Sequence, residues 1–249
     1  MDNYLTTEIS GSTAVIRLNF PHLNAVNQNL IDNLYNCLSE LEENQNIKVI
    51  IVIGTEKAFS SGLDLKETLN RNTRQAVTDD FINKKWEKLS ECRVPVIAAV
   101  SGYTLGAGLE LALMCDIVVS SDTAIFGQPE IKFGMIPGLG ATQRLARLIG
   151  WQKTSAICLT GEFFNSAQAL NFGIVIKIAP YTELISSALE LAKKIDAQPK
   201  SALIAAKQAI KSAQETTLSQ GIALERQLFY NLLSLEDKER RIRRFLAKK

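Results

Sequence analysis

Residues 101–116 read SGYTLGAGLELALMCD, and this stretch decides how the rest of the chain is interpreted. It follows Val96–Val100, a short apolar run of the kind found in strands that are buried on both faces. The small residues at 106–108 then lead directly into an apolar helical pattern that reaches Cys115. We therefore predict a strand that enters a helix through a glycine turn. The first N–H groups of such a helix lack partners within it and favour negative charge nearby.

Strand and helix patterns alternate on both sides of this stretch. Strands are predicted at Thr13–Leu18, 48–53, Val96–Val100, 117–120 and 174–178, and helices at 26–41, 77–89 and 106–115. After Pro180 the pattern is wholly helical, over 182–197, 200–213, Leu218–Leu233 and 236–247. This order predicts an α/β core over residues 1–180 and a C-terminal helical region over residues 181–249.

The composition is that of a globular protein with no requirement for a polyanionic partner. The chain has 249 residues, 46% of them apolar, which is enough to bury a core without disulfide or metal support. Its 28 basic and 26 acidic side chains leave a net charge of +2. The charge is uneven, because residues 238–249 hold seven Lys or Arg and one Glu, which leaves 21 basic and 25 acidic side chains elsewhere.

Cysteine and histidine usage excludes several kinds of chemistry. Cys37, Cys92, Cys115 and Cys158 are far apart, which argues against a zinc site and favours reduced thiols. His22 is the single histidine, so a Ser-His-Asp or Cys-His triad is improbable, and we expect no metal. The polar N-terminus lacks a signal-peptide core, and no apolar run approaches the roughly 20 residues that span a bilayer. We expect a cytoplasmic protein without membrane contact.

Three segments hold the candidate functional residues. Residues 58–66 (AFSSGLDLK) place a Ser-Ser-Gly turn after a strand, and residues 101–116 carry Glu110 one turn into their helix. Residues 126–140 (FGQPEIKFGMIPGLG) place Glu130 beside a glycine-rich loop. Two amide-rich strand ends and two carboxylates are the groups needed to stabilise an enolate while protons move.

Plainer interpretations exist for each of these features. Glycines before a helix are often only turn residues, Glu110 suits the first helical turn, and Glu130 suits a solvated loop. The GAG sequence falls short of a dinucleotide-binding fingerprint, and no phosphate-binding Lys-Ser/Thr loop is present. The functional interpretation therefore depends on the features occurring together.

Longer motifs in the same segments resemble the enoyl-CoA hydratase/isomerase (crotonase) superfamily. AFSSGLDL is similar to the family pattern A-F-x-A-G-x-D-L, and GYTLGAGLELALMCDI to G-x-x-x-G-G-G-x-E-L-A-x-x-C-D. FGQPEIKFGMIPGLGATQRL is similar to F-x-x-P-E-x-x-x-G-x-x-P-G-x-G-G-T-Q-R-L, and the likeness covers nearly the whole chain. The resemblance implies a spiral of ββα turns with a C-terminal helical trimerisation region. It also implies a homotrimer, or a homohexamer made of paired trimers.

The resemblance further implies an acyl-CoA thioester substrate and no separate cofactor. The thioester oxygen would lie between the backbone N–H groups of Leu63 and Ala107, where Ala107 replaces the usual glycine. Glu110 and Glu130 would hold one water, with Glu110 taking its proton and Glu130 giving a proton to Cα. The Gly138 amide would help to hold that water. The remaining expected substrate-binding positions are Ser61, Asp64, Leu65 and Lys66. The implied reaction is the addition of water to a trans-2-enoyl-CoA.

Several alternatives remain open at this stage. An enoyl-CoA isomerase of the family works with one carboxylate at the second position, and other members act on different acyl thioesters. An RNA-binding role would use the basic C-terminus, but the chain lacks a basic surface interleaved with aromatic residues in the way single-strand binders show, so we expect no nucleic-acid partner. The basic side chains could instead meet the phosphates of CoA in a neighbouring subunit, or form a solvated face. These side chains are Lys238, Arg240, Arg241, Arg243, Arg244, Lys248 and Lys249.

Overall fold

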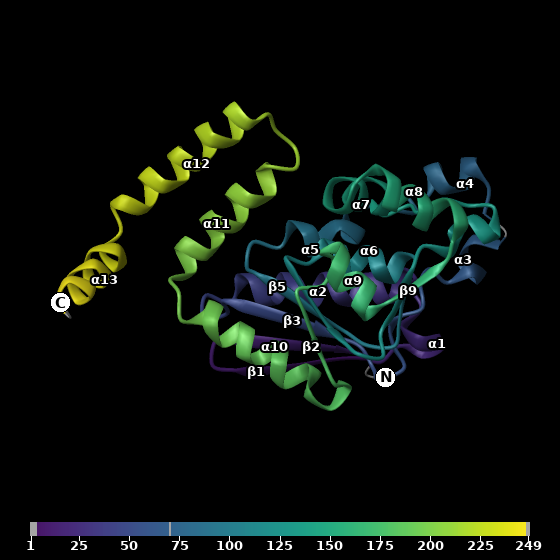
Figure 1. Cartoon of the computed structure of the whole chain (residues 1–249), viewed down its shortest axis with the longest axis horizontal. Helices are drawn as coiled ribbons and strands as arrows, with labels where there is room; N and C mark the ends of the chain where they lie inside the picture. The colour runs from purple at the N-terminus through teal and green to yellow at the C-terminus, as the bar shows by residue number, and fades with distance from the viewer. Residues whose placement is uncertain (1–3, 70, 248–249) are drawn as a thin grey trace.

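Two β-sheets and a projecting arm of three helices organise the protein (Figure 1). The structure is a computed structural model that describes residues 4–69 and 71–247. Within these residues, one sheet has six strands and the other has four. Two residues of the basic C-terminus, Lys248 and Lys249, lie outside the described part of the chain.

The six-stranded sheet forms the centre of the core. Its strand order is β1 (Leu5–Ser10), β2 (Thr13–Leu18), β3 (Val49–Ile53), β5 (Val96–Val100), β7 (Ile117–Ser121) and β10 (Lys177–Ala179). β1 and β2 form an antiparallel hairpin, and the remaining pairs are parallel. Every residue of β3 and β5 is buried, as their unbroken apolar sequences predict for strands covered on both faces.

The four-stranded sheet gives the fold its spiral. Its order is β4 (Ala58–Ser60), β6 (Tyr103–Leu105), β8 (Ile125–Gly127) and β9 (Phe163–Asn165). Along the chain, β3, β5 and β7 of the large sheet are followed by β4, β6 and β8 of the small one, and each pair of strands is followed by helix. This repetition confirms the predicted α/β spiral of ββα turns.

Helices cover both faces of the large sheet. On one face, alternate strand residues such as Ile50 and Ala98 belong to the main core, against which α2 (Gln28–Glu43) packs through Leu30, Leu34 and Leu38. On the other face, residues such as Ile51 and Ile97 pack against α10 (Tyr181–Asp196). The period-two alternation of the strands therefore supplies two separate apolar surfaces.

Shorter helices connect the spiral turns. They are α1 (Pro21–Asn24), α3 (Leu65–Leu69), α4 (Thr73–Thr78), η1 (Lys84–Glu87), α5 (Lys88–Glu91), α6 (Ala107–Met114), η2 (Pro129–Phe133), α7 (Ala141–Ile149), α8 (Trp151–Thr160) and α9 (Ser166–Phe172). Gly108 of α6 lets this helix approach β4 closely, since a Cβ there would lie 2.6 Å from the Ser60 Cβ. The close approach brings the start of α6 beside the end of β4.

The prediction of one helix over residues 77–89 is wrong. The segment divides into the end of α4, the 3₁₀ turn η1 and α5. Asp80 adopts a left-handed backbone with φ 47°, and the Asn83 Oδ1 accepts a hydrogen bond from the Lys85 N–H at 3.0 Å. Asp and Asn side chains stabilise turns by such local hydrogen bonds, so they override the apolar spacing. The break carries Phe81 and Ile82 to the cavity described below.

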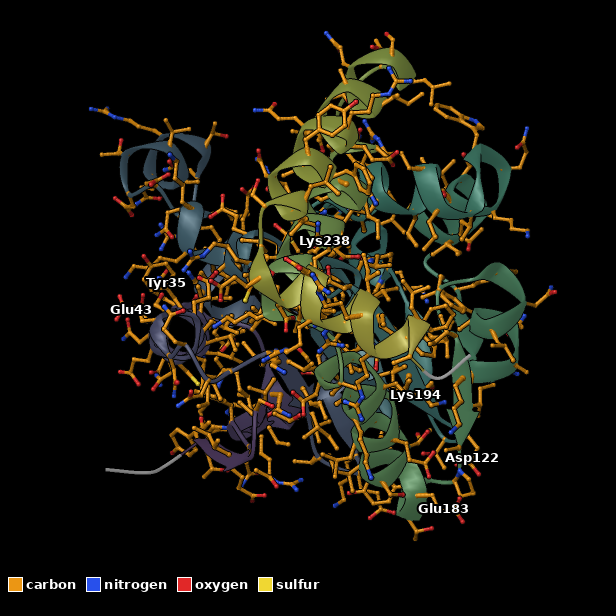
Figure 2. All side chains as sticks on the ribbon, turned by 90° about the vertical axis from the view of Figure 1, so that its left-hand side faces the viewer. Tyr35, Glu43, Asp122, Glu183, Lys194 and Lys238 are labelled. Carbon is orange, nitrogen blue, oxygen red and sulfur yellow. The ribbon has the colours of Figure 1, made fainter. Side chains whose placement is uncertain are left out.

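The last three helices extend from the core as an arm (Figure 1). They are α11 (Lys200–Ser212), α12 (Leu218–Leu233) and α13 (Glu236–Leu246), close to their predicted bounds. Lys207 anchors α11, because its Nζ lies 2.6 Å from the Asp116 Oδ2 and 3.0 Å from the Val94 carbonyl oxygen. Figure 2 views this arm face on, with Lys238 of α13 in front of the core. In the described residues, no helix is long and apolar enough to cross a membrane.

Candidate active site

Glu110 lies at the start of α6 with its side chain buried. Its exposed fraction is 1%, and its Oε1 accepts hydrogen bonds from the Leu139 and Ala141 N–H groups, both at 2.8 Å. These amides belong to the glycine-rich loop and the first turn of α7, so the carboxylate ties two spiral turns together. Burial raises the pKa of Glu110, while these amides, the Gly138 amide and the charge of Arg144 oppose the rise. The net effect is a raised pKa of Glu110, and the two hydrogen bonds hold its side chain at a fixed position.

Glu130 lies on η2, which follows β8 of the small sheet. Burial raises its pKa to about 7, its own backbone N–H opposes this rise, and the charge of Glu110 adds to it. A Cβ at Gly106 would lie 2.6 Å from the Glu130 Oε1. Gly106 also has φ 50°, so both its backbone conformation and its contact with Glu130 require glycine. The Glu130 carboxylate therefore lies directly against the start of α6.

Two backbone N–H groups without internal partners lie close together beside the carboxylates. The loop after β4 is held by hydrogen bonds from the Ser61 N–H to the Leu23 oxygen at 2.9 Å and from the Asp64 N–H to the Val26 oxygen at 2.8 Å. Between them, the Leu63 N–H has no hydrogen-bond partner among residues 4–69 and 71–247, and the Ala107 N–H begins a helix. A Cβ at Gly62 would lie 3.8 Å from the Ala107 nitrogen, which places the two peptide groups side by side.

A cavity of about 810 Å³ joins these groups. Seven predicted site residues line it, namely Ser61, Leu63, Leu65, Ala107, Glu110, Glu130 and Gly138. The predicted positions Asp64 and Lys66 are outside the lining. The Asp64 Oδ1 instead accepts a hydrogen bond from the Lys66 N–H at 3.0 Å, so it stabilises the turn. His22 is exposed, and its carbonyl oxygen accepts a hydrogen bond from the Ser61 Oγ at 2.9 Å.

The inner wall of the cavity is apolar and separates it from a second space. Phe81 and Trp86 pack edge to face, with ring centroids 5.8 Å apart, and both line the cavity. A second cavity of about 370 Å³ shares Ile82, Gly138 and Leu139 with the first. The Ile82 Cδ1 would lie 3.3 Å from a Cβ at Gly138, and both residues line the two cavities. The Ile82 side chain therefore lies where the two cavities adjoin.

Comparisons with known proteins give the same picture as the motifs. The enoyl-CoA hydratase/isomerase family model matches residues 8–249. A Mycobacterium bovis protein named "probable enoyl-CoA hydratase" is 41% identical over 94% of this chain and 91% of its own length. A Dictyostelium discoideum protein named "probable enoyl-CoA hydratase, mitochondrial" is 39% identical over 98% of this chain and 88% of its own. The crystal structure of an enoyl-CoA hydratase from Bacillus anthracis superposes with a TM-score of 0.92 at 31% identity, covering 99% of this chain and 97% of that one.

The chain belongs to the enoyl-CoA hydratase/isomerase family. Within this family fold, the cavity brings together two carboxyl groups of different acidity and two unpaired N–H donors. Such a set can exchange protons with a bound molecule near neutral pH while its N–H groups stabilise a developing oxyanion. No group of three or more His, Cys, Asp or Glu side chains suited to a metal occurs in the described residues.

Sequence reasoning missed Gln128, which lies two residues before Glu130. Its side chain is fully buried, and its amide nitrogen donates to both Glu130 carboxylate oxygens at 3.1 Å when the amide is oriented to satisfy both groups. A glutamine between glycine and proline has no periodic signal, so only the fold reveals this contact. The one available hint was its position inside the third family motif.

Proposed function

We propose that this member of the enoyl-CoA hydratase/isomerase family adds water to a trans-2-enoyl-CoA and forms a 3-hydroxyacyl-CoA. The observation that carries the proposal is the placement of Glu110 and Glu130 in one cavity with different environments. Glu110 is fixed by two amide hydrogen bonds at 2.8 Å, whereas burial raises the pKa of Glu130 to about 7. A base and an acid are therefore available together near neutral pH.

The thioester carbonyl would be bound by the N–H groups of Leu63 and Ala107. Both are backbone donors, so the Leu63 side chain is free to vary and the alanine at 107 keeps the donor. The Ala107 methyl group occupies the place where the family pattern has glycine, and it makes the cavity slightly narrower. In the proposed reaction these donors stabilise the enolate oxygen that develops when water adds at Cβ. One such donor is worth about 10²–10³ in rate.

The two carboxyl groups carry the proton movements of one turnover, after which Glu110 gives its proton to solvent and Glu130 takes one up, so both return to their starting forms. Ionised Glu110 accepts a proton from the water as its oxygen bonds to Cβ, and protonated Glu130 delivers a proton to Cα. The Gly138 amide, next to the loop that holds Glu110, supports the same water. In the reverse direction Glu130 removes the proton from Cα. This chemistry neither transfers electrons nor requires a metal, so the proposal includes no cofactor beyond the CoA of the substrate.

The CoA portion would follow the backbone of residues 61–66 toward the cavity mouth. Ser61 and Leu65 line the cavity and would contact the pantetheine chain. Asp64 and Lys66 lie outside the lining, so Asp64 would act by shaping the turn and Lys66 by meeting a phosphate at the mouth. A reducing compartment such as the cytoplasm suits the four free thiols.

A hydration assay tests the proposal directly. Crotonyl-CoA and longer trans-2-enoyl-CoA esters would be followed by the loss of the conjugated enoyl absorbance. Glu110→Gln and Glu130→Gln should each lower kcat by at least about 10²-fold, while far-ultraviolet circular dichroism stays unchanged. The matched control is Glu162→Gln, an exposed glutamate outside the cavity, which should keep wild-type turnover. Absence of turnover with every chain length, or full activity of the Glu110/Glu130 double variant, contradicts the proposal.

Double-bond isomerisation is the second candidate activity. It requires one group that moves a proton between two carbons, and Glu130 with a pKa near 7 is suited to that step. A trans-3-enoyl-CoA supplied to the Glu110→Gln variant distinguishes the two activities. Retained isomerisation together with lost hydration would assign isomerisation to Glu130 alone. Loss of both would show that each reaction depends on Glu110.

We also propose that the helical arm joins copies of this chain into a trimer or a hexamer. The arm exposes large apolar side chains, including Ile210 at 71%, Leu218 at 81% and Tyr230 at 61%. Such a surface favours a protein contact over solvent. Analytical ultracentrifugation should give three or six copies, and Leu218→Glu should reduce this number. A wild-type monomer contradicts the proposal.

The basic end of the arm is proposed to meet CoA phosphates of a neighbouring copy. Within one chain, α13 lies at the opposite end of the molecule from α3 (Figure 1). Leu65 and Thr68 of α3 line the cavity. Arg240 and Arg241 pair with Asp237, and Arg243 pairs with Glu239, which leaves Lys238 and Arg244 without ion pairs in the described residues. Truncation after Glu236 should weaken CoA-ester binding. Unchanged affinity and oligomer size would favour a solvated face.

A further inference from the structure

Arg144 is a half-buried cation that the proposed mechanism does not yet use. It lies in the first turn of α7, and its Nε is buried without a hydrogen-bond partner in the described chain. No ion pair of Arg144 occurs among the described residues either. A buried guanidinium nitrogen without a partner is costly, so its position calls for a reason other than local stability.

The Arg144 guanidinium group lies close to Gly140, which stands in the loop whose N–H groups hold Glu110. A Cβ at Gly140 would lie 3.3 Å from the Arg144 Nε and 3.9 Å from its Cζ. Gly140 has φ 105° and stands between Leu139 and Ala141, whose N–H groups both donate to the Glu110 Oε1. The guanidinium group thus lies next to the centre of the loop that positions the carboxylate.

Among the charged side chains near Glu110, Arg144 supplies the positive charge that opposes the effect of burial. In the described chain, Arg144 of α7, Glu130 of η2 and Cys158 of α8 are the ionisable side chains that face Glu110 from neighbouring elements. Burial raises the pKa of the Cys158 thiol to about 11, so the thiol is neutral near pH 7. Glu130 adds negative charge when ionised, and Arg144 alone of the three supplies positive charge.

Other carboxylates do not compete for this cation by direct pairing. Glu87 and Glu215 line the 370 Å³ cavity together with Arg144, but neither forms an ion pair with it. The charge of Arg144 lowers the pKa of Glu110 against the effect of burial. Charge interactions over several ångströms of protein interior are large enough to change an ionisation state.

We propose that Arg144 is a positioning residue for the hydration reaction, and that its charge keeps Glu110 ionised while its planar group holds the loop at residues 139–141 on the carboxylate. The proposal rests on the proposed function, because it assigns the base form to Glu110. The different surroundings of Glu110 and Glu130 then explain why one acts as the base and the other as the acid. Glu110 has a cation and two loop amides, whereas the groups acting on Glu130 are the Gln128 side-chain amide, its own backbone N–H and the like charge of Glu110. The acid side of the pH–rate profile would then depend on Arg144.

The test compares Arg144→Gln, Arg144→Lys and the control Arg147→Gln. Arg147 lies on the same helix, is exposed, and donates from its Nη1 to the Gln143 carbonyl oxygen at 3.1 Å. The profile of kcat/KM against pH should move its acid limb upward by about one pH unit in Arg144→Gln. Arg144→Lys should restore most of that position, and Arg147→Gln should leave it unchanged. An equal loss of kcat/KM at every pH, with no movement of the limb, overturns the proposal.

A second measurement separates this proposal from the proposed function. Infrared difference spectroscopy of the full-length protein without substrate follows the carboxyl band that disappears in Glu110→Gln. Its titration midpoint should rise in Arg144→Gln and stay in place in Arg147→Gln. If the wild type hydrates no enoyl-CoA, the proposed function fails, while a shifted midpoint still supports the charge effect on Glu110. An unshifted midpoint in a folded Arg144→Gln protein overturns that effect whatever the activity.

Discussion

Glu130→Gln should make the protein more stable at alkaline pH while removing its activity. Burial raises the pKa of Glu130 from its usual 4.5 to about 7 in the folded protein. Between these values the folded state keeps a proton that the unfolded chain has released. The free energy of unfolding therefore falls as pH rises through this interval, and the loss is complete above about pH 7. A glutamine has nearly the same shape and cannot ionise, so the variant avoids this loss.

The size of the effect follows from the same interval. Each pH unit corresponds to about 1.4 kcal/mol, which gives about 3 kcal/mol as an upper limit across the interval. Glu130 is only partly buried, and solvent screening lowers this to about 1–2 kcal/mol. The gain should appear near pH 8 and vanish near pH 4, where Glu130 is protonated in both states.

Urea unfolding at these two pH values measures the difference between variant and wild type. Other ionisable groups titrate in both proteins, so their contributions largely cancel in that difference. Glu162→Gln, the exposed control, should show no pH-dependent gain. A Glu130→Gln protein that is equally or less stable than wild type near pH 8 would refute the reasoning. So would a gain of equal size at both pH values, because ionisation would then not be its cause.

Three further substitutions test the geometry of the cavity and of the arm. Ile82→Ala should open the first cavity into the second and raise kcat/KM for long-chain relative to short-chain enoyl-CoA by about tenfold. An unchanged chain-length profile would contradict the position of Ile82 between the two cavities. Gly106→Ala should push Glu130 away from α6, since the new Cβ would lie 2.6 Å from the Glu130 Oε1, and we expect a loss of about 10²-fold in kcat. Full activity of the variant, together with a crystal structure that shows Glu130 in place, would disprove the contact. Lys207→Met should remove the ion-pair partner of Asp116 and the donor to the Val94 carbonyl oxygen, and lower the unfolding free energy by about 1–3 kcal/mol. Faster limited proteolysis of the arm should accompany it, whereas unchanged urea and proteolysis curves contradict Lys207 as the anchor.

Much of the fold was readable from local sequence. The apolar runs at β3 and β5 predicted buried strands, and the helical patterns after Pro180 predicted α10 to α13 within a few residues. The one helix predicted over residues 77–89 failed because Asp80 and Asn83 form turns there. Apolar spacing records which side chains are buried, but it does not record how often the backbone turns between them.

The motifs predicted several residues that line the cavity, but they did not predict the contacts among those residues. The motifs supplied Glu110, Glu130 and the two N–H donors, and they also supplied Asp64 and Lys66, which the cavity excludes. Gln128 and Arg144 were missed, because their roles depend on contacts with Glu130 and with the Gly140 peptide.

The sequence by itself determined the family, the strand–helix order and the chemical groups available for the reaction. These are local properties, since hydrophobic period, glycine placement and motif spacing are written along the chain. Only the tertiary structure decided how Glu110 and Glu130 differ. Both are glutamates near glycines in the sequence, yet one receives two loop amides and the charge of a cation, while the other receives the Gln128 side-chain amide and a like charge. Ionisation depends on burial and on the charges that folding brings near, so it is a property of the folded arrangement.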